Sequence, residues 1–260
     1  MIPKTIHYCW FGNKQKPKLI KACISSWKKY LTGYEILEWN ERNVDLNNPF
    51  VLEALRLKKW AFVADFVRLK VLYENGGIYL DTDMMVIKKF DDLLLNNCFF
   101  GKEDDNFISA GIIGAVKHNE FIKRCLFKYE NILINNKTDF NKITMPIIVT
   151  QTYKEFLEGR LLEDFKDIDV MIYPVSYFYP FPNKKKYDIK NYKNYIEHLT
   201  FAVHLWNASW VEYDEFDYLK NKQYLKAFLK LCKSIFLDNK MSFFYMKKIS
   251  RHFIYSFKRR

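Results

Sequence analysis

The start of the chain changes its hydrophobic period twice. Residues 2–10 form a largely apolar run that predicts a strand, and residues 17–30 place apolar side chains three and four positions apart, which predicts a helix. Residues 34–39 then alternate between apolar and polar positions, as a second strand does. This succession predicts two parallel strands, and sheets of this kind bind ligands at the carboxyl ends of their strands.

A third segment, residues 58–75, carries apolar side chains around nearly its whole circumference and predicts a buried helix. Asp65 and Arg68 lie inside it, three positions apart, so their side chains share a face. A buried charged pair is costly unless both partners are satisfied. Two interpretations stay open from the residues alone, a structural ion pair and a pair at a functional site.

The helix is expected to stop at Gly76, where glycine suits a left-handed turn. The apolar run 78–80 predicts a short buried strand that delivers Asp81 and Asp83 at its carboxyl end. Residues two apart on a strand point to the same side, so both carboxylates can converge on one cation. The alternative is a solvated acidic turn, and the preceding apolar strand favours the metal site over that alternative.

Further strands and helices are expected after the acidic pair, and two more residues, His204 and Trp10, are candidates for ligand binding. Further strands are expected at 99–101, 107–114 and 200–206, and further helices at 119–135 and 146–160. His204 falls at the end of the last of these strands, where it is either a satisfied, partly buried histidine or a ligand. Trp10 ends the first strand and is either a core aromatic or a stacking platform for a ring.

Composition fits one sizeable α/β domain with a short appendage, because the chain has 260 residues and 49% of them are hydrophobic. The five cysteines contain no closely spaced pair, which argues against a disulfide framework or a zinc site and indicates a reducing compartment. Neither a leader segment nor an apolar stretch of about 18–20 residues is evident. We therefore expect a cytoplasmic protein.

The net charge of +12 is concentrated at the carboxyl terminus. Residues 220–260 combine twelve basic residues with one acidic residue, and aromatic side chains are interleaved with them, whereas residues 1–219 are nearly neutral. We accordingly expect one domain over 1–219 and a helical tail over 220–260. Such a tail is typical of an anchor on an anionic membrane surface, and a solvated lysine face is the equally weighted alternative.

Three ordered blocks of the sequence resemble glycosyltransferase family 32. The blocks are residues 2–12, residues 62–83 and residues 204–210. Together they span roughly residues 1–212, and the small bacterial members that make capsular or surface polysaccharide are the most similar. The resemblance implies a GT-A fold, a single Rossmann-like mixed sheet flanked by helices. It also implies a retaining transfer of a hexose from a nucleotide sugar, expected to be a UDP-sugar, to a glycan or lipid-linked acceptor.

The same resemblance assigns residues that contact the sugar donor. They are Trp10, Asp65, Arg68, Tyr79, Asp81 and Thr82. Trp10 is similar to the aromatic that stacks on the base, and Asp65 with Arg68 to the helix pair at the donor sugar and diphosphate. Ala64 stands where the large clostridial toxins of the family carry a serine, so that contact is missing here.

Metal and catalytic roles also follow from the resemblance. Asp81, Asp83 and His204 are the implied ligands of Mn²⁺ or Mg²⁺. Asp83 and Arg68 are the implied catalytic residues, which stabilise the departing diphosphate while the leaving phosphate takes the acceptor proton. An enzyme of this kind would act at the inner face of the plasma membrane.

Two other classes of function remain as alternatives. A metal-dependent phosphohydrolase would need a further acidic ligand set or a water-activating base, and the sequence presents no convincing one. A non-enzymatic carbohydrate- or nucleic-acid-binding protein would use the aromatic residues for stacking and the acids for structure. No nucleic-acid partner is expected for the glycosyltransferase.

Overall fold

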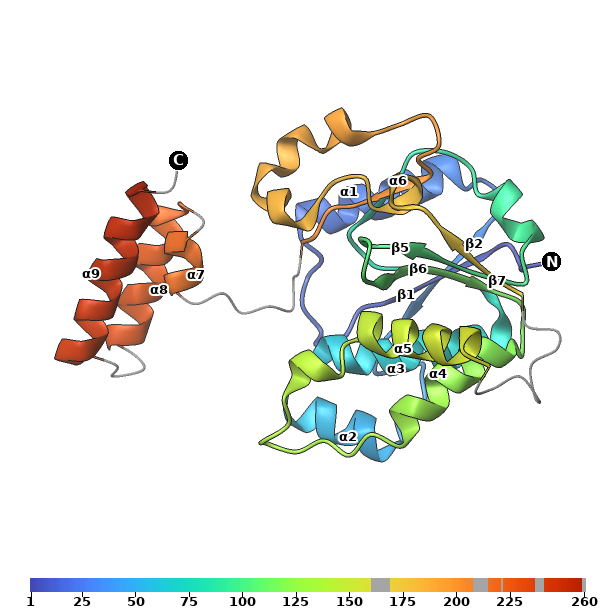
Figure 1. Ribbon diagram of the computed structural model, residues 1–260, viewed down its shortest axis with the longest axis horizontal. Coiled ribbons are helices and arrows are strands. Elements are labelled where there is room, and N and C mark those ends of the chain that lie inside the picture. Colours follow the sequence, from blue (N-terminus) through green and yellow to red (C-terminus); the bar gives the residue numbers. More distant parts are fainter. Residues whose placement is uncertain (160–168, 208–214, 221, 237–240, 259–260) are drawn as a thin grey trace. The chain divides into compact units, whose positions relative to one another are not determined.

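The computed structural model describes residues 1–159, 169–207, 215–220, 222–236 and 241–258 (Figure 1). The chain divides into two compact units, Met1–Asn207 and Ala208–Arg260. We expected the division between residues 219 and 220, but the short helix α7 (Glu215–Lys220) packs against the helices that follow it. The division therefore falls after Asn207.

A mixed six-stranded sheet forms the centre of the first unit. Its strands are β1 (Thr5–Cys9), β2 (Glu35–Trp39), β3 (Gly77–Leu80), β5 (Cys98–Lys102), β6 (Ile108–Ala115) and β7 (Val170–Tyr173). Their order is β2-β1-β3-β6-β5-β7, and β6 runs antiparallel to both of its neighbours, while the remaining pairs are parallel. The mixed α/β sheet expected for a GT-A domain is confirmed.

A second, two-stranded sheet joins distant parts of the chain. Strand β4 (Met84–Val86) pairs antiparallel with β8 (Ala202–His204). Strand β4 was not predicted, because three residues are too few to show alternation. We expected a single sheet, and the structure adds this two-stranded sheet, which starts directly after the acidic pair.

Helices cover both faces of the six-stranded sheet (Figure 1). The helices of the first unit are α1 (Lys18–Tyr30), α2 (Pro49–Arg56), α3 (Trp60–Asn75), α4 (Glu120–Glu130), α5 (Met145–Leu157) and α6 (Val175–Phe178). Short 3-10 segments lie at Asp91–Leu95, Phe140–Lys142 and Asn183–Tyr195. One hydrophobic core lies between the sheet and α3, α4 and α5, and a second lies on the side of α1 and α6.

Two glycines make the sharp passage from α3 into β3. Gly76 and Gly77 have φ values of 69° and 105°, a region that side chains with a Cβ rarely adopt. A Cβ on Gly77 would lie 2.8 Å from the Thr5 carbonyl oxygen, and the His7 ring nitrogen Nε2 lies 2.8 Å from the Gly76 carbonyl oxygen. This close approach sets β3 beside β1, so the two strands end at the same edge of the sheet.

Gly77→Ala is expected to lower the free energy of unfolding by about 2–4 kcal/mol, because left-handed strain and overlap with the β1 backbone add. Gly33→Ala is the matched control: its φ is 85°, yet a Cβ there meets nothing within 4 Å, so about 1–2 kcal/mol is expected. Urea unfolding followed by tryptophan fluorescence measures both. Equal losses in the two variants would show that the contact with β1 is unimportant.

Candidate active site

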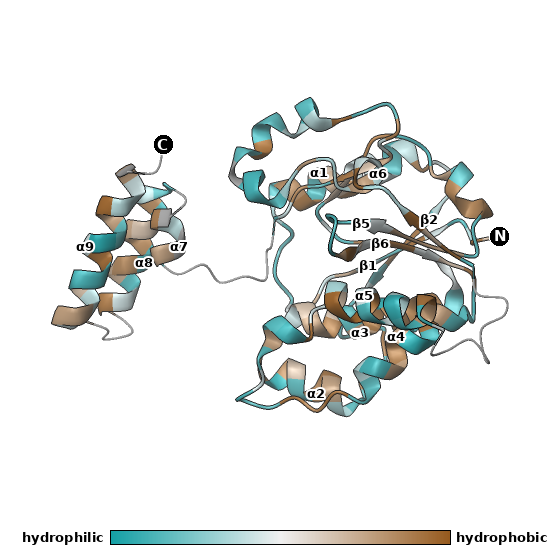
Figure 2. Cartoon of the chain, viewed as in Figure 1, coloured by the Kyte–Doolittle hydropathy of each residue, from teal (hydrophilic) through white to brown (hydrophobic). Residues whose placement is uncertain are grey.

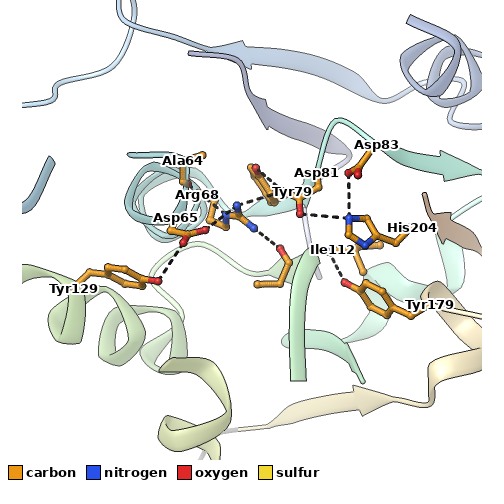
Figure 3. Close-up of polar contacts among 11 residues, drawn as sticks. Ala64, Asp65, Arg68, Tyr79, Asp81, Asp83, Ile112, Tyr129, Tyr179 and His204 are labelled. Atoms are coloured by element: carbon orange, nitrogen blue, oxygen red, sulfur yellow. Dashed lines mark hydrogen bonds and ion pairs between the residues drawn. The ribbon is translucent and has the colours of Figure 1, made fainter. Parts of the chain in front are cut away.

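The two expected metal-binding aspartates lie between β3 and β4 (Figure 3). Asp81 follows the last residue of β3, and its backbone N–H donates to the Gly111 carbonyl of β6 at 2.7 Å. Asp83 precedes Met84, whose partner across the small sheet is His204, the last residue of β8. The two-stranded sheet thus brings the late histidine to the acidic pair from more than a hundred residues away.

His204 and Asp83 form a buried, hydrogen-bonded pair. His204 Nε2 lies 3.1 Å from Asp83 Oδ1 and 3.9 Å from Asp81 Oδ2, and the two side chains of the pair are each only 11% exposed. The Asn207 backbone N–H donates to Asp83 Oδ2 at 2.7 Å. Two negative carboxylates therefore face one imidazole in a region of low solvent access.

The electrostatics of this pair favour a positive charge beside the carboxylates. Burial raises the pKa of Asp83, but attraction to His204 and the hydrogen bonds from His204 and Asn207 outweigh it, so the pKa lies below its usual value. Burial lowers the pKa of His204, but attraction to Asp83 and Asp81 outweighs it, so that pKa lies above its usual value. The two shifts therefore favour an ionised Asp83 with a positive charge beside it.

Asp81, Asp83 and His204 fit a divalent cation. Each offers one ligand atom, and these atoms lie within 4.8 Å of one another. Ligands that share one Mg²⁺- or Mn²⁺-sized ion at about 2.1 Å lie at most about 4.2 Å apart, so small rotations of the side chains suffice. Within the described part of the chain, the buried His204 Nδ1 has no hydrogen-bond partner. The ring therefore has a nitrogen free for a further ligand.

Aromatic rings fix the orientation of the imidazole. The Trp206 ring centroid lies 4.1 Å from that of His204, and the Tyr179 centroid lies 5.6 Å from it. Trp206 has a φ of 54°, an uncommon conformation for a bulky residue. This turn follows β8 directly and precedes Asn207, whose N–H reaches Asp83. Backbone strain of this kind clusters at functional sites.

Arg68 links helix α3 to the acidic pair. Its Nη2 lies 2.9 Å from Asp65 Oδ1 and 3.3 Å from Asp81 Oδ1, and its Nη1 donates to the Ala110 carbonyl at 2.7 Å. The guanidinium carbon lies 4.5 Å from the centre of the Tyr79 ring, and the residue is only 6% exposed. The structural ion pair is present, and it extends to Asp81.

Two tyrosines complete this buried network (Figure 3). Tyr79 donates its hydroxyl to Asp81 Oδ1 at 3.1 Å, and Tyr129 of α4 donates to Asp65 Oδ2 at 3.4 Å. Burial raises the pKa of Asp65 to about 6, although Arg68 attracts its charged form. Sequence reasoning missed Tyr129, because its distance from Asp65 along the chain leaves no local signal.

Trp10 lies at the same edge of the sheet as the acidic pair. It follows β1, and in the parallel register of β1 and β3, His7 pairs with Tyr79. The Trp10 indole N–H donates to the Lys14 carbonyl at 2.7 Å, and Lys16 Nζ lies 5.5 Å from the centre of the Trp10 ring. Thr82, half-buried, lies between the two aspartates. The structure thus brings both predicted donor residues to this edge and shows no role for either.

Glu103 and Ser109 are further polar residues at this site that sequence reasoning missed. Glu103, half-buried after β5, interacts electrostatically with His204 and Asp81 and lies within hydrogen-bonding reach of the Ser109 hydroxyl. Burial raises the pKa of Glu103, although His204 and Ser109 oppose that shift. The neighbouring Asp104 instead accepts the backbone N–H groups of Asn106 and Phe107 in its own loop.

Close approach of strand β6 to the site depends on a small residue. A Cβ on Gly111 would lie 3.2 Å from Asp81 Oδ2 and 3.1 Å from the Tyr179 hydroxyl. The same hydroxyl accepts the Ile112 backbone N–H at 3.1 Å. Glycine at position 111 therefore lets β6 pack closely against the carboxylate of Asp81.

Comparison with known proteins agrees with this geometry. Residues 17–100 match the sequence model of the family described as "Glycosyltransferase sugar-binding region containing DXD motif". The chain is 26% identical over 257 residues to an uncharacterized glycosyltransferase of Acanthamoeba polyphaga mimivirus, a similarity that covers 94% of this chain and 91% of that protein.

Two mammalian enzymes are similar over shorter regions. Human alpha-1,4-N-acetylglucosaminyltransferase is 25% identical over 162 residues, which cover 58% of this chain and 44% of that protein. Mouse lactosylceramide 4-alpha-galactosyltransferase is 30% identical over 151 residues, which cover 56% of this chain and 40% of that protein. The chain spans less than half the length of these two relatives. Within the matched residues 17–100, Asp81-Thr82-Asp83 has the DXD pattern that the description of the family names.

Proposed function

We propose that the chain is a metal-dependent, retaining glycosyltransferase of family 32. It transfers a hexose from a nucleotide sugar, in the first instance a UDP-sugar, to a glycan or lipid-linked acceptor. The strongest support for this proposal is the convergence of Asp81, Asp83 and His204 at the edge of the sheet. The two aspartates lie within the residues that match the sugar-binding family, and His204 lies beside them from a later part of the chain. A cation held there lies where α/β sheets bind nucleotide ligands.

The three ligands favour Mn²⁺ and still admit Mg²⁺. Carboxylates suit both ions, whereas an imidazole nitrogen suits Mg²⁺ less well, because that ion prefers oxygen ligands. When bound, the cation would supply Lewis-acid stabilisation of the diphosphate. Asp83, held by His204 and the Asn207 N–H, would be the fixed ligand, and Asp81 would be the adjustable one, since its side chain is 27% exposed.

The buried network gives Arg68 a positioning role in this proposal. Its guanidinium is bound to Asp65, Asp81 and the Ala110 carbonyl, which leaves little of it for a ligand to touch. It would stabilise the departing charge through Asp81, whose carboxylate it holds in place. Trp10 would stack on the base, with Lys16 nearby.

The transfer itself would proceed on one face of the sugar. The acceptor oxygen forms a bond to the anomeric carbon on the side from which the diphosphate departs. The bond between that carbon and the phosphate oxygen breaks, and the leaving phosphate takes the acceptor proton. Glu103, which follows β5 and interacts electrostatically with His204, would orient a hydroxyl of the donor sugar or the acceptor.

Glu103→Gln is expected to lower the turnover of sugar transfer by about 10–100-fold, because an amide oxygen accepts a weaker hydrogen bond from the oriented hydroxyl than a carboxylate does. Mn²⁺ affinity should stay unchanged, since Glu103 lies outside the ligand set. The neighbouring exposed Asp105→Asn serves as the control, and its turnover should match the wild type. Equal turnover in all three proteins would remove Glu103 from the site.

Surface polysaccharide synthesis is the setting that we propose for this activity. A mouse relative is named for a ceramide lipid acceptor, which supports a lipid-linked acceptor here as well. Small bacterial members of family 32 associated with capsular or surface polysaccharide, the relatives indicated by the three sequence blocks, provide the second support. The enzyme would then act on the cytoplasmic side, where nucleotide sugars are made.

Hydrolysis of a panel of nucleotide sugars, with Mn²⁺, Mg²⁺ or a chelator, tests the proposed function. The expected result is release of nucleoside diphosphate from one donor, dependent on metal and accelerated by an acceptor glycan. Release of inorganic phosphate from simple phosphate esters would favour the phosphohydrolase. Binding without metal dependence or turnover would favour a binding protein, and a steep salt dependence with DNA or RNA would favour a nucleic-acid partner.

A further inference from the structure

The carboxyl-terminal unit exposes far more apolar surface than its size requires. Its helices are α7, α8 (Tyr224–Phe236) and α9 (Phe243–Lys258). Among the described residues, this unit of residues 208–260 exposes twelve large hydrophobic side chains, whereas residues 1–207 expose ten. Single exposed apolar residues need no explanation, but a concentration of them marks an interaction surface.

A small core fixes which helix faces point outward. Leu219, Ala227 and Ile249 are buried together, one from each helix. The buried Glu215 carboxylate accepts hydrogen bonds from the Ser234 hydroxyl at 3.2 Å and the Tyr245 hydroxyl at 2.7 Å. Because these contacts join α7 to α8 and α9, the opposite faces of the two longer helices are not free to turn inward.

Helix α8 has three distinct faces. Ala227 and Ser234 lie on the buried face, and the exposed Leu225, Leu229 and Phe236 lie on the face roughly opposite, at about 100° per residue. Lysines occupy the flank between these two faces: Lys226, Lys230 and Lys233. An exposed apolar stripe beside a lysine stripe is the pattern of a helix at a membrane interface.

Helix α9 repeats this arrangement. Ile249 is buried, whereas the exposed Phe243, Ile254 and Phe257 share one side of the helix. Lys247 and Arg251 lie beside them, opposite Ile249, and both are exposed. Figure 2 shows hydrophobic and hydrophilic patches side by side along both α8 and α9. The two helices thus expose apolar residues next to basic residues.

We propose that this unit docks on an anionic lipid bilayer, with the exposed apolar residues of α8 and α9 in the interface and the basic residues against lipid phosphates. Charge complementarity commits the surface to this partner, because the residues from 220 onward carry nearly all of the chain's net positive charge. Within the described residues, no helix has the length and apolar character that crossing a bilayer demands. The proposal is independent of the catalytic activity.

Flotation of the full-length protein with phosphatidylcholine vesicles, with and without about 30% phosphatidylglycerol, tests this docking at about 0.15 M salt. Binding to the anionic vesicles should be at least about 10-fold tighter than to the neutral ones. The double variant Lys230→Gln/Lys233→Gln should bind about 30-fold more weakly.

Leu229→Ser should weaken binding by about 10-fold or more, because a buried leucine contributes most of its transfer free energy at the interface. Leu133→Ser is the matched control, since Leu133 is an exposed leucine of the first unit, and it should bind as the wild type does. Helical content from circular dichroism, unchanged in each variant, separates a loss of docking from a loss of folding.

Three outcomes would overturn the proposal. Equal binding to neutral and anionic vesicles would remove the electrostatic contribution. A dimer in solution that Leu229→Ser dissociates, without lipid binding, would assign the apolar surface to a second copy of the chain. The third outcome is a monomer that does not bind lipid and whose first unit is destabilised by Leu229→Ser. That result would assign the apolar surface to the first unit of the same chain.

Discussion

Asp83→Asn is expected to lower metal-dependent turnover of the nucleotide-sugar donor by about 10³-fold or more. The substitution removes the carboxylate that His204 and the Asn207 N–H hold in place, and with it the fixed ligand of the proposed cation site. Asparagine has nearly the same shape and can still accept the Asn207 N–H. The fold should therefore persist, with a melting temperature within a few degrees of the wild type.

Steady-state release of UDP from the donor, with Mn²⁺ in excess, measures this effect. Asp105→Asn is the appropriate control, since it removes an exposed acid from the nearby loop and should leave turnover unchanged. Turnover within about 3-fold of the wild type in Asp83→Asn would be far below the effect expected of a metal ligand. Such a result would contradict the assigned role of Asp83.

Arg68→Met is expected to have a large effect on the free energy of unfolding. Removing one partner from a buried ionic network costs about 3–5 kcal/mol, because the carboxylates of Asp65 and Asp81 remain without their counter-charge. Lys70→Met on the same helix is the matched control: its partner Asp45 is largely exposed, so less than about 1 kcal/mol is expected. Chemical denaturation measures the two losses.

The cost of losing Arg68 should increase with pH. Burial raises the pKa of Asp65 to about 6 even with Arg68 present, and it should rise further in the variant. Above about pH 6, Asp65 is therefore still protonated in the native variant, whereas it has lost its proton in the native wild type and in both unfolded chains. The stability difference should therefore grow as pH rises from about 5 to about 8. A difference that is independent of pH would show that Asp65 is not part of the network.

Local patterns were sufficient to predict the elements that carry most of the site. The strand, helix and strand at the start of the chain are β1, α1 and β2, and the all-round apolar segment is the buried helix α3. Gly76 ends that helix, and Asp81 and Asp83 follow β3. Each of these features depends on residues close together in the sequence, where period and turn chemistry act directly.

Contacts between distant segments could not be predicted from local patterns. The bond between His204 and Asp83 depends on the pairing of β4 with β8, and β4 is too short to show a period. The link from Arg68 to Asp81 crosses from a helix to a strand end, so spacing within the helix revealed only its partner Asp65. Glu103 reaches the site through the pairing of β5 with β6, which no local feature indicates.

Other differences have physical explanations that the sequence partly contained. Helix α2 was not predicted, although Asn48 accepts the Phe50 and Val51 N–H groups and Pro49 follows it, which is a recognised start signal. Helix α4 ends at Glu130, earlier than the expected residue 135. In the third resemblance block, Ala208, Ser209 and Trp210 lie outside the described residues.

Calorimetric titration of UDP into the protein, with Mn²⁺ and then with a chelator, tests whether the acidic pair and His204 hold a cation that binds the diphosphate. If Asp81, Asp83 and His204 hold the cation that binds the diphosphate, UDP should bind one site per chain with Mn²⁺ present. Binding should then be lost, or weakened by about 10²-fold or more, with the chelator and in Asp83→Asn. UDP binding of equal affinity with and without metal, or unchanged Mn²⁺ dependence in Asp83→Asn, would show that these residues hold no such cation.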